Sequence, residues 1–440
     1  MRFAFRTFGR GTHPPANKFT ADSPLVRLDV PEKLFLPLSQ HIGAPAVPVV
    51  SVGDSVAAGQ LVGESCGKVS ARVHSPVSGR VEGIVSRPTA SGGKCAHIVI
   101  VPDGEGRRVS MPVLGQPSPE EVKERVREAG IVGMGGAGFP THVKLSPAKK
   151  PEFFLVNGAE CEPYITCDCR LMTERAKEVV RGARLLAYAA GADKALIGVE
   201  SNKKEAYAAI LAECVGDDLG VSVQAALLRT KYPQGAEKQL VFALTGRRVP
   251  PGGLPADVGC VVDNVHTAYA VCRAADFGEP LTERALTVGG REAGRPGNYF
   301  VAIGTPFSFV REMTRGEKSD DDLVKIINGG PMMGIAQSGL DASVGKTTSS
   351  LLFFGEKEAA LQEPTQCINC GRCIRCCPMK LSPRDIERAT LGKDTERLEE
   401  LYVQSCMECG VCSYVCPAKR PLVHAIRLAK KTLRERGGGK

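Results

Sequence analysis

The chain has 440 residues, 43% of them hydrophobic and none tryptophan, which is too long for one ordinary core and predicts about three or four domains. No apolar run reaches the ~18 residues that a membrane-spanning helix needs, so we expect any membrane role to be peripheral. The net charge is +9, but no recognition fold and no interleaving of basic and aromatic residues accompany it, which argues against nucleic acid as a partner.

The first part of the chain is rich in Pro, Gly and Val and alternates like short strands. Turns at Gly53-Asp54 and Ser78-Gly79 within this period-two pattern predict a compact β domain. The stretches "VGDSVAAGQLVG" and "VHSPVSGRV" resemble the half-barrels of biotinyl and lipoyl carrier domains. The hairpin tip that would hold the carrier lysine contains His74, Ser75 and Pro76 instead. The resemblance therefore implies a barrel-sandwich fold without a swinging arm.

A helix is predicted to begin at Ser118, because this N-cap residue is followed by Pro119 and by Glu121 as its capping-box partner. Gly130 is predicted to end the helix. The stretch "IVGMGGAGFPTHVK" follows directly. Its glycines can expose backbone N–H groups as a nest for a phosphate or a ring edge, and a tight turn without a ligand is the alternative. The loop follows a helix, so it is not the dinucleotide fingerprint.

An apolar strand is predicted in "EFFLVNGAECEPYITCDCRLM"; it ends in Asn157 and is followed by Glu160 and Glu162. If this segment stays extended, both carboxylates point to one face. They then lie either in solvent or in a site that binds ribose or nicotinamide groups. The stretch "ADKALIGVESNKKEAYAAI" predicts a further strand and helix, which indicates an α/β domain.

Two cysteine motifs close the chain, "CINCGRCIRCCP" and "CMECGVCSYVCP". Disulfides belong to small secreted chains, and "MRFAFRTFGRGTHPP" lacks the apolar core of a signal peptide. Zinc sites usually separate two cysteine pairs or include histidine. Each motif instead has the spacing C-x2-C-x2-C-x3-C-P. In this pattern the first three thiolates bind one 4Fe-4S cluster and the fourth binds the other cluster. This predicts one cluster on Cys367, Cys370, Cys373 and Cys416, and a second on Cys406, Cys409, Cys412 and Cys377.

Cys376 fits neither set and is expected to be a small buried hydrophobic residue beside the clusters. The chain has 17 cysteines, and cluster assembly needs reduced thiols, so we expect a reducing compartment on the cytosolic side. The basic stretch "AIRLAKKTLRERGGGK" predicts a solvated helix face, or a docking face for an acidic redox protein or an anionic membrane surface.

The stretches "GMGGAGFPTHVK", "VNGAECEP", "GAEKQLVFALTG" and "VDNVHT" occur in the order found in the flavin- and NADH-binding subunit of respiratory complex I. Together with the N-terminal domain, "PLSQHIGAPA", "NGGPMMG" and the paired cysteine motifs, they make the whole chain resemble the RnfC family, the C subunits of Rnf (Rsx) electron-transport complexes. The segment from Ala285 to Phe307 resembles the β-grasp (SLBB-like) domain of the complex I subunit.

This resemblance implies a multidomain α/β and β protein. The implied domains are a carrier-like β domain without the carrier lysine (1–115), an FMN/NADH-binding α/β domain (116–280), a β-grasp SLBB-like domain (281–355) and a C-terminal α-helical, ferredoxin-like domain with two 4Fe-4S clusters (356–440).

The resemblance also implies which residues bind FMN and the nicotinamide nucleotide. They are Gly133, Gly135, Gly136 and Gly138 of the flavin loop, Phe139, Lys144 as the phosphate-binding lysine, Asn157, Glu160, Glu162, Glu237 and Asn264. The sequence departs from the complex I pattern at four positions, Met134, Leu145, Ala159 and Ala236. These departures concern the pose of NADH more than the binding of FMN.

The implied function is an NADH:acceptor oxidoreductase module that exchanges electrons between NAD(H), FMN and two 4Fe-4S clusters and is linked to ferredoxin. Its partners would be the other subunits of a membrane-bound complex at the cytoplasmic face of the bacterial inner membrane. Hydride transfer to a flavin needs no side-chain base, so no catalytic residue is assigned. The alternatives are a flavin iron-sulfur protein of the cobalamin reductase type, or an electron relay and scaffold whose flavin site is empty.

Overall fold

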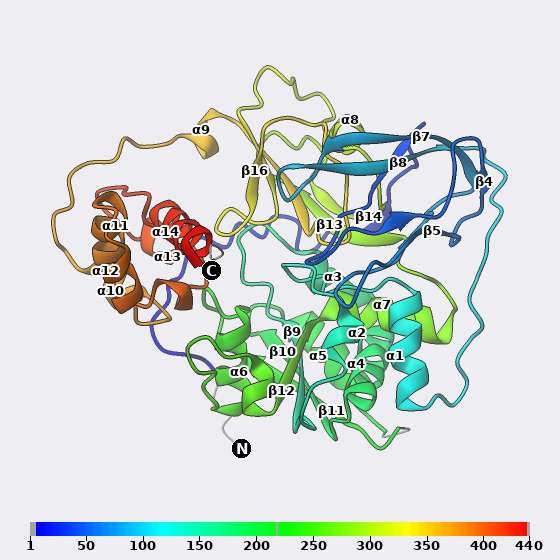
Figure 1. Ribbon diagram of the computed structural model, residues 1–440, viewed down its shortest axis with the longest axis horizontal. Coiled ribbons are helices and arrows are strands. Elements are labelled where there is room, and N and C mark those ends of the chain that lie inside the picture. Colours follow the sequence, from blue (N-terminus) through cyan, green and yellow to red (C-terminus); the bar gives the residue numbers. More distant parts are fainter. Residues whose placement is uncertain (1–5, 217–218, 438–440) are drawn as a thin grey trace.

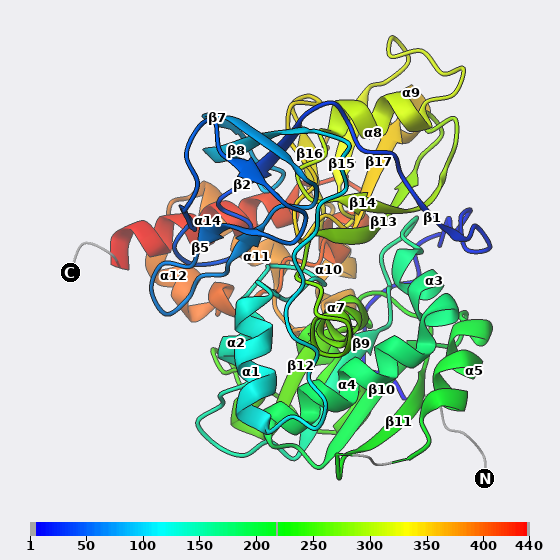
Figure 2. The ribbon, with the colours of Figure 1, turned by 90° about the vertical axis from the view of Figure 1, so that its right-hand side faces the viewer.

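The computed structural model describes residues 6–216 and 219–437. Within these residues the strands form four sheets, and a group of helices follows at the carboxyl end. Figure 1 shows the parallel sheet below the other three sheets, with the C-terminal helices to one side. Figure 2 shows the same arrangement from the side that carries the N-terminal strands.

Two small sheets form the N-terminal β unit. The first has the order β2 (Leu34–Pro37), β8 (Lys94–Pro102), β7 (Gly79–Pro88) and β4 (Ser55–Val56), and the second has the order β3 (Val47–Pro48), β5 (Leu61–Glu64) and β6 (Val73–His74). Alternate residues such as Val81, Ile98 and Ile100 are fully buried between them, as the period-two pattern predicted. His74 and Ser75 are buried as well, at 6% and 0% exposure. The hairpin therefore presents no exposed tip at these residues, in agreement with a fold that carries no swinging arm.

The α/β unit has a parallel sheet in the order β11 (Ser222–Leu228), β10 (Lys194–Glu200), β9 (Phe153–Gly158) and β12 (Cys260–Asn264). Its strands are continuous apolar runs because both faces are covered. Phe154, Val156 and Ile197 face one core, and Leu155 and Leu196 face the other. The helices are α1 (Pro119–Glu128), α2 (Thr141–Lys144), α3 (Cys167–Glu174), α4 (Ala176–Ala190), α5 (Lys204–Glu213), α6 (Glu237–Thr245) and α7 (Val265–Asp276), with a 3-10 turn at Pro255–Val258.

Helix α1 has the predicted ends. The Ser118 side chain accepts a hydrogen bond from the Glu121 N–H, and the Glu121 carboxylate accepts one from the Ser118 N–H at 2.7 Å. Gly130 follows the helix with φ +66°, a conformation that glycine adopts without strain. The capping box and the glycine stop are therefore confirmed, and they fix where the glycine loop begins.

Helices α4 and α7 approach so closely that a side chain at Gly182 would collide with the backbone. A Cβ atom there would lie 1.7 Å from the Ala268 carbonyl oxygen. We expect Gly182→Ala to lower the free energy of unfolding by about 2 kcal/mol or more, because the two helices must separate. Thermal unfolding checks this, with Lys177→Ala on the exposed side of α4 as the neutral control. Equal unfolding midpoints for both variants would contradict the predicted collision.

The third unit is a six-stranded sheet in the order β1 (Leu25–Arg27), β14 (Gly297–Ala302), β13 (Glu283–Gly289), β17 (Ser350–Phe354), β15 (Lys325–Asn328) and β16 (Ile335–Gln337). Helix α8 (Phe307–Thr314) packs on it through Phe307 and Val310, which are fully buried. Strand β1 comes from the start of the chain and pairs in parallel with β14. The chain upstream of the N-terminal β unit is thus part of this sheet.

The C-terminal unit is helical and lies beyond an extended connection after α9 (Glu356–Ala359) (Figure 1). Its elements are α10 (Arg372–Cys376), α11 (Pro383–Leu391), α12 (Thr395–Glu400), a 3-10 turn at Val403–Ser405, α13 (Val411–Tyr414) and α14 (Leu422–Gly437). Ile386 and Ile426 are fully buried in its core together with several of the cysteines. Across residues 6–216 and 219–437, none of the helices combines the length and apolar character needed to cross a membrane.

Candidate functional site

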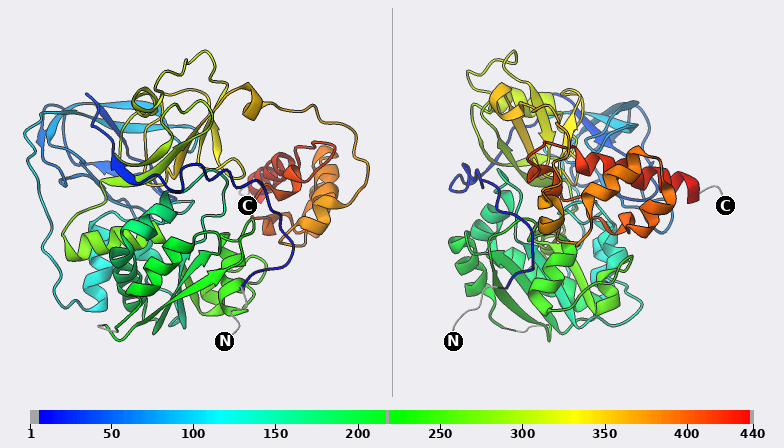
Figure 3. Two further views of the ribbon diagram at one scale, coloured as in Figure 1. Left: turned by 180° about the vertical axis from the view of Figure 1, so that it is seen from behind. Right: turned by 90° about the vertical axis from the view of Figure 1, so that its left-hand side faces the viewer.

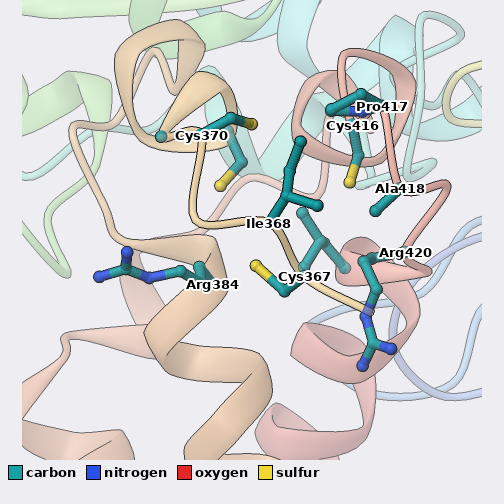
Figure 4. A pocket seen from close by; sticks show the side chains of 11 residues that line it. Cys367, Ile368, Cys370, Arg384, Cys416, Pro417, Ala418 and Arg420 are labelled. Carbon is teal, nitrogen blue, oxygen red and sulfur yellow. The ribbon is translucent and has the colours of Figure 1, made fainter. Parts of the chain in front are cut away.

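The eight motif cysteines gather around two hollows in the C-terminal unit. Cys367, Cys370, Cys373 and Cys416, the outer set, line one hollow. Cys377, Cys406, Cys409 and Cys412, the inner set, line the other. Figure 4 shows sulfur atoms of the outer set around a shared space, with Arg384 and Arg420 beside it. Each hollow thus takes three cysteines from one motif and the fourth from the other, the arrangement that the spacing predicted.

Local backbone geometry explains why glycine stands within each motif. Gly371 and Gly410 precede helices α10 and α13 with φ +70° and +77°, where a larger residue would be strained. Among the described residues, no carboxylate lines either hollow, so the donors are sulfur alone. Burial raises the pKa of Cys409 to about 12, and ionisation of these thiols therefore needs a positive centre such as iron. The two sets fit the 4Fe-4S clusters that the motifs imply.

Cys376 lies outside both hollows and packs against the cluster of Tyr232, Cys409 and Val411. It is partly buried. This position agrees with the small hydrophobic role expected of it.

The glycine loop lies at the carboxyl end of the parallel sheet. Strand order reverses between β9 and its neighbour β12, and ligands of open α/β sheets bind at such a switch point. Asn157, the penultimate residue of β9, and Asn264, the last residue of β12, are in register with each other. The Asn264 side chain donates to the Asn157 carbonyl at 3.2 Å and to Asp168 at 2.7 Å. A Cβ atom on Gly135 would lie 2.8 Å from the Asn264 Cβ, so only glycine brings the loop this close.

The tip of the glycine loop is open to a ligand. Gly135 and Gly136 are exposed, and a Cβ atom on Gly136 would meet nothing within 4 Å. Within the described residues, the N–H groups of Gly135 and Gly136 have no acceptor in the protein. Gly133 N–H donates to the Phe139 carbonyl at 2.9 Å, which closes the base of the loop. Free N–H groups of this kind suit an anionic group or a flavin ring edge.

Lys144 supplies a cation beside the loop. Its ammonium donates to the Val262 carbonyl at 3.0 Å and lies 4.0 Å from the Asp263 carboxylate. A Cβ atom on Gly133 would lie 3.6 Å from the same ammonium. Burial raises the pKa of Asp263, and the charge of Glu237, an exposed residue at the start of α6, also interacts with Lys144. The structure thus brings the lysine, the glycine loop and Glu237 to one place, and this set fits FMN.

Glu160 and Glu162 do not share one face, because the segment between them does not stay extended. Glu160 has φ +46°, which turns the chain between the two residues. The Glu160 carboxylate accepts from the Asp168 N–H at 2.7 Å, at the start of α3. The Glu162 carboxylate accepts from the Met332 N–H at 3.1 Å and lies 3.3 Å from the Tyr232 hydroxyl. Burial raises the pKa of each carboxyl to about 7.

Two lysines near Glu160, Lys203 buried and Lys18 partly buried, could not be found from the sequence. Lys18 donates to the carbonyls of Glu160 at 2.9 Å and Glu162 at 2.8 Å, and also to that of Ile165. Lys203 pairs with Glu200 at 3.3 Å and lies 3.5 Å from the Glu160 carbonyl. Lys18 stands in no motif and is more than 140 residues away in sequence, so no local signal could have indicated it.

Tyr232 connects the glycine-loop unit to the inner set. It is 1% exposed; its hydroxyl donates to the Cys409 carbonyl at 2.8 Å and lies 3.3 Å from the Glu162 carboxyl group. The stretch "NGGPMMG" fills the neighbouring space, because a Cβ atom on Gly410 would lie 2.7 Å from the Met332 carbonyl. A Cβ atom on Gly330 would lie 2.2 Å from the Glu162 carboxylate. These contacts place the inner set against the α/β unit.

Replacing Glu162 by glutamine is expected to change the pH dependence of stability. Its native pKa of about 7 exceeds the unfolded value of 4.5. The native state therefore holds the proton more tightly, and stability falls as pH rises from 4.5 to about 7. Glu162→Gln should be more stable than the parent by about 1–2 kcal/mol at pH 8 and equal to it near pH 4.5. Thermal unfolding at both pH values checks this, with exposed Glu312→Gln as the control; a constant difference between Glu162→Gln and the parent would contradict it.

The departures from the complex I pattern lie mostly inside the core. Met134 and Leu145 are 1% and 0% exposed and belong to the largest hydrophobic cluster. Ala159 is fully buried against α6. These three side chains therefore do not project into the open tip of the glycine loop.

Family models match three parts of the chain. Residues 6–105 match the RnfC barrel sandwich hybrid domain, residues 126–273 the Nuo51 FMN-binding domain, and residues 359–417 the 4Fe-4S dicluster domain. Among solved structures, a chain of NAD+-reducing [NiFe]-hydrogenase in the air-oxidized state is 20% identical, with a TM-score of 0.51. That match covers 70% of this chain and 63% of the hydrogenase chain, and it supports the fold alone.

Two curated relatives match along nearly the whole length. The C subunit of the proton-translocating ferredoxin:NAD(+) oxidoreductase complex of Clostridium ljungdahlii is 45% identical over 98% of this chain and 95% of its own. The C subunit of the Na(+)-translocating ferredoxin:NAD(+) oxidoreductase complex of Acetobacterium woodii is 44% identical over 98% of both chains. With these matches and the barrel-sandwich, flavin-type and dicluster units together, the chain belongs to the RnfC family, the C subunits of ion-translocating ferredoxin:NAD(+) oxidoreductase (Rnf) complexes.

Proposed function

We propose that this chain exchanges electrons between NAD(H), FMN and two 4Fe-4S clusters as a peripheral subunit of a membrane-bound, ion-translocating complex linked to ferredoxin. The observation that carries this proposal is the Tyr232 hydroxyl, which joins the flavin-type unit to the inner cysteine set through the Cys409 carbonyl at 2.8 Å. The inner cysteine set therefore packs against the same α/β unit that carries the glycine loop and Lys144, as transfer of electrons between a flavin and a cluster requires.

FMN, when bound, supplies the conversion between a two-electron hydride and single electrons. The residues of this chain would bind and orient it. The free N–H groups of Gly135 and Gly136 and the Lys144 ammonium are suited to its anionic and polar groups. Asn157 and Asn264 hold the ends of β9 and β12 together beneath the loop. Phe139 lies partly exposed at the same loop and would receive the nicotinamide nucleotide.

Glu160 and Glu162 are assigned to positioning. Glu160 caps the start of α3, and Glu162 holds Tyr232 and the Met332 backbone. Both carboxyls have a pKa near 7 because of burial, so each is partly neutral at the pH of the cytoplasm. A neutral carboxyl repels the phosphates of a nicotinamide nucleotide less than an ionised one does.

The positions of the two cysteine sets indicate the order in which electrons pass through the clusters. The inner set contacts Tyr232, whereas the outer set lies beside Ile368, which is 67% exposed. Arg372, Arg375 and Arg388 are exposed on the same motif and the helix after it. We therefore assign the cluster of the inner set to electron exchange with the flavin. The cluster of the outer set would exchange electrons with another subunit that docks on these exposed arginines.

The test is anaerobic purification with quantification of iron and FMN, followed by titration with NADH. About eight irons and one FMN per chain, with bleaching of the flavin by NADH, are expected. Iron without flavin, even after reconstitution with FMN, would overturn the oxidoreductase proposal and make this chain a relay. Reconstitution with FMN but no bleaching by NADH would overturn the nicotinamide assignment.

A further inference from the structure

The first described residues form a strap that runs from the edge of the parallel sheet, past the segment before Cys377, to the loop that carries Glu160 and Glu162. We define the N-terminal strap as residues 6–20. Figure 3 shows this dark blue segment passing from the parallel sheet, beside the C-terminal helices, toward the six-stranded sheet. It begins as a bridge from Arg6 to Leu228 at the edge strand β11. Phe8, at 3% exposure, anchors it in the core.

The middle of the strap is joined to the Tyr232 segment by backbone hydrogen bonds. Thr12 N–H donates to the Tyr232 carbonyl, and Tyr232 N–H donates to the Thr12 carbonyl, both at 2.9 Å. Gly11 has φ +82°, and a Cβ atom on it would lie 2.5 Å from the Tyr232 carbonyl oxygen. Only glycine therefore fits at this point of the strap.

The same residues also hold the first cysteine motif. Gly11 N–H donates to the Cys376 carbonyl at 2.9 Å. The Arg10 guanidinium donates to the Ile374 carbonyl at 3.0 Å. Cys376 directly precedes Cys377, the inner-set cysteine that comes from this motif. Gly11 thus connects the backbone of an inner-set segment to Tyr232, whose hydroxyl reaches Cys409 of the same set.

The far end of the strap holds the acidic loop of the α/β unit. Lys18 donates to three carbonyls of residues 160–165, and its side chain is 15% exposed. The Ala16 carbonyl accepts from the Tyr164 N–H at 3.0 Å. One continuous segment therefore fixes both the loop that carries Glu160 and Glu162 and the segment that carries Cys377.

We propose that the N-terminal strap is a positioning element that sets the separation between the flavin site and the inner cluster, with Gly11 as its contact on the cluster side and Lys18 on the flavin side. The proposal rests on the proposed function, because it assumes that electrons pass between the flavin and the inner cluster. It places no ligand on the strap. The strap fixes geometry, and small displacements between reacting groups carry large rate penalties.

The test compares two glycine variants of the full-length protein. Gly11→Ala introduces a methyl group against the Tyr232 carbonyl, whereas Gly9→Ala, two residues earlier, meets nothing within 4 Å. In Gly11→Ala we expect iron and FMN contents to match the parent and NADH to bleach the flavin at the parental rate. Subsequent reduction of the clusters, followed by rapid-freeze electron paramagnetic resonance, should be slower by roughly 10- to 100-fold. Gly9→Ala should behave like the parent.

Hydrogen–deuterium exchange gives a readout that does not depend on turnover. Amides of residues 230–235 and 371–377 should exchange faster in Gly11→Ala and remain unchanged in Gly9→Ala. If Gly11→Ala does not fold, Arg10→Ala removes the bond to the Ile374 carbonyl and should produce a smaller change in the same direction. Parental cluster reduction and exchange in both Gly11→Ala and Arg10→Ala would overturn the strap proposal. Failure of NADH to reduce the parental flavin would overturn the proposed function instead, and the exchange result would still decide the strap.

Discussion

Replacing Cys416 by alanine is expected to remove the outer cluster and leave the inner one. Cys416 belongs to the second motif in sequence, but it lines the hollow formed by Cys367, Cys370 and Cys373. Iron should fall from about eight to about four per chain. Cys367→Ala should have the same effect, although its cysteine lies in the other motif. This equivalence is the signature of crossed ligation.

The reciprocal pair is Cys377→Ala and Cys406→Ala, which should both remove the inner cluster. The paramagnetic resonance spectrum of the cluster that remains should be the same in these two variants. It should differ from the spectrum shared by Cys416→Ala and Cys367→Ala. NADH should no longer reduce the surviving outer cluster at the parental rate, because the inner set lies between it and Tyr232 in the proposed path. Cys376→Ala is the matched control and should keep both clusters, since Cys376 lies outside both hollows.

A different pairing would contradict the crossed assignment. If Cys377→Ala matched Cys367→Ala, and Cys416→Ala matched Cys406→Ala, each motif would hold its own cluster. Loss of iron in Cys376→Ala would show that the extra cysteine is a ligand. Because the comparison uses the spectrum that remains, it does not depend on how much iron each preparation retains.

The sequence was most informative where structure follows from residues close together in the chain. The capping box of Ser118 and Glu121 was predicted and is present, because both partners lie within one helical turn. The cysteine spacing likewise predicted which four sulfurs gather at each hollow. The order of the motifs predicted that the glycine loop, Asn157 and Asn264 belong to one site. The register of β9 and β12 explains why the two asparagines meet there.

Contacts between distant segments could not be predicted. Lys18 donates hydrogen bonds to carbonyls more than 140 residues away in the sequence. The Tyr232 hydroxyl donates to the carbonyl of Cys409, which is 177 residues further along the chain. The same holds for β1, whose partner strand β14 lies far along the chain. The left-handed backbone at Glu160 is a further case. Non-glycine residues rarely adopt it, so nothing in the sequence indicates the turn, and the tertiary hydrogen bond from the start of α3 to Glu160 stabilises it.

Lys144→Met is expected to weaken FMN binding by about 10- to 100-fold, corresponding to the loss of charge-assisted hydrogen bonds worth about 1.5–3 kcal/mol. The Lys144 ammonium lies beside the glycine loop and 4.0 Å from the Asp263 carboxylate. Without it, Asp263 and the exposed Glu237 would face an incoming phosphate with no cation between them. Electrostatic repulsion should therefore add to the loss of the direct contact.

Titration of the apo-flavin protein with FMN and with riboflavin separates the phosphate contact from the rest of the site. Riboflavin lacks the phosphate, so its affinity should be nearly the same in the parent and in Lys144→Met. Lys150→Met is the matched control, because Lys150 is 64% exposed and pairs with Asp193 at the surface. An equal loss of affinity for both flavins would mean that Lys144 supports the shape of the loop through its bond to the Val262 carbonyl. An unchanged affinity for FMN would remove Lys144 from the site altogether, and the N–H groups of the glycine loop would then have to hold the phosphate alone.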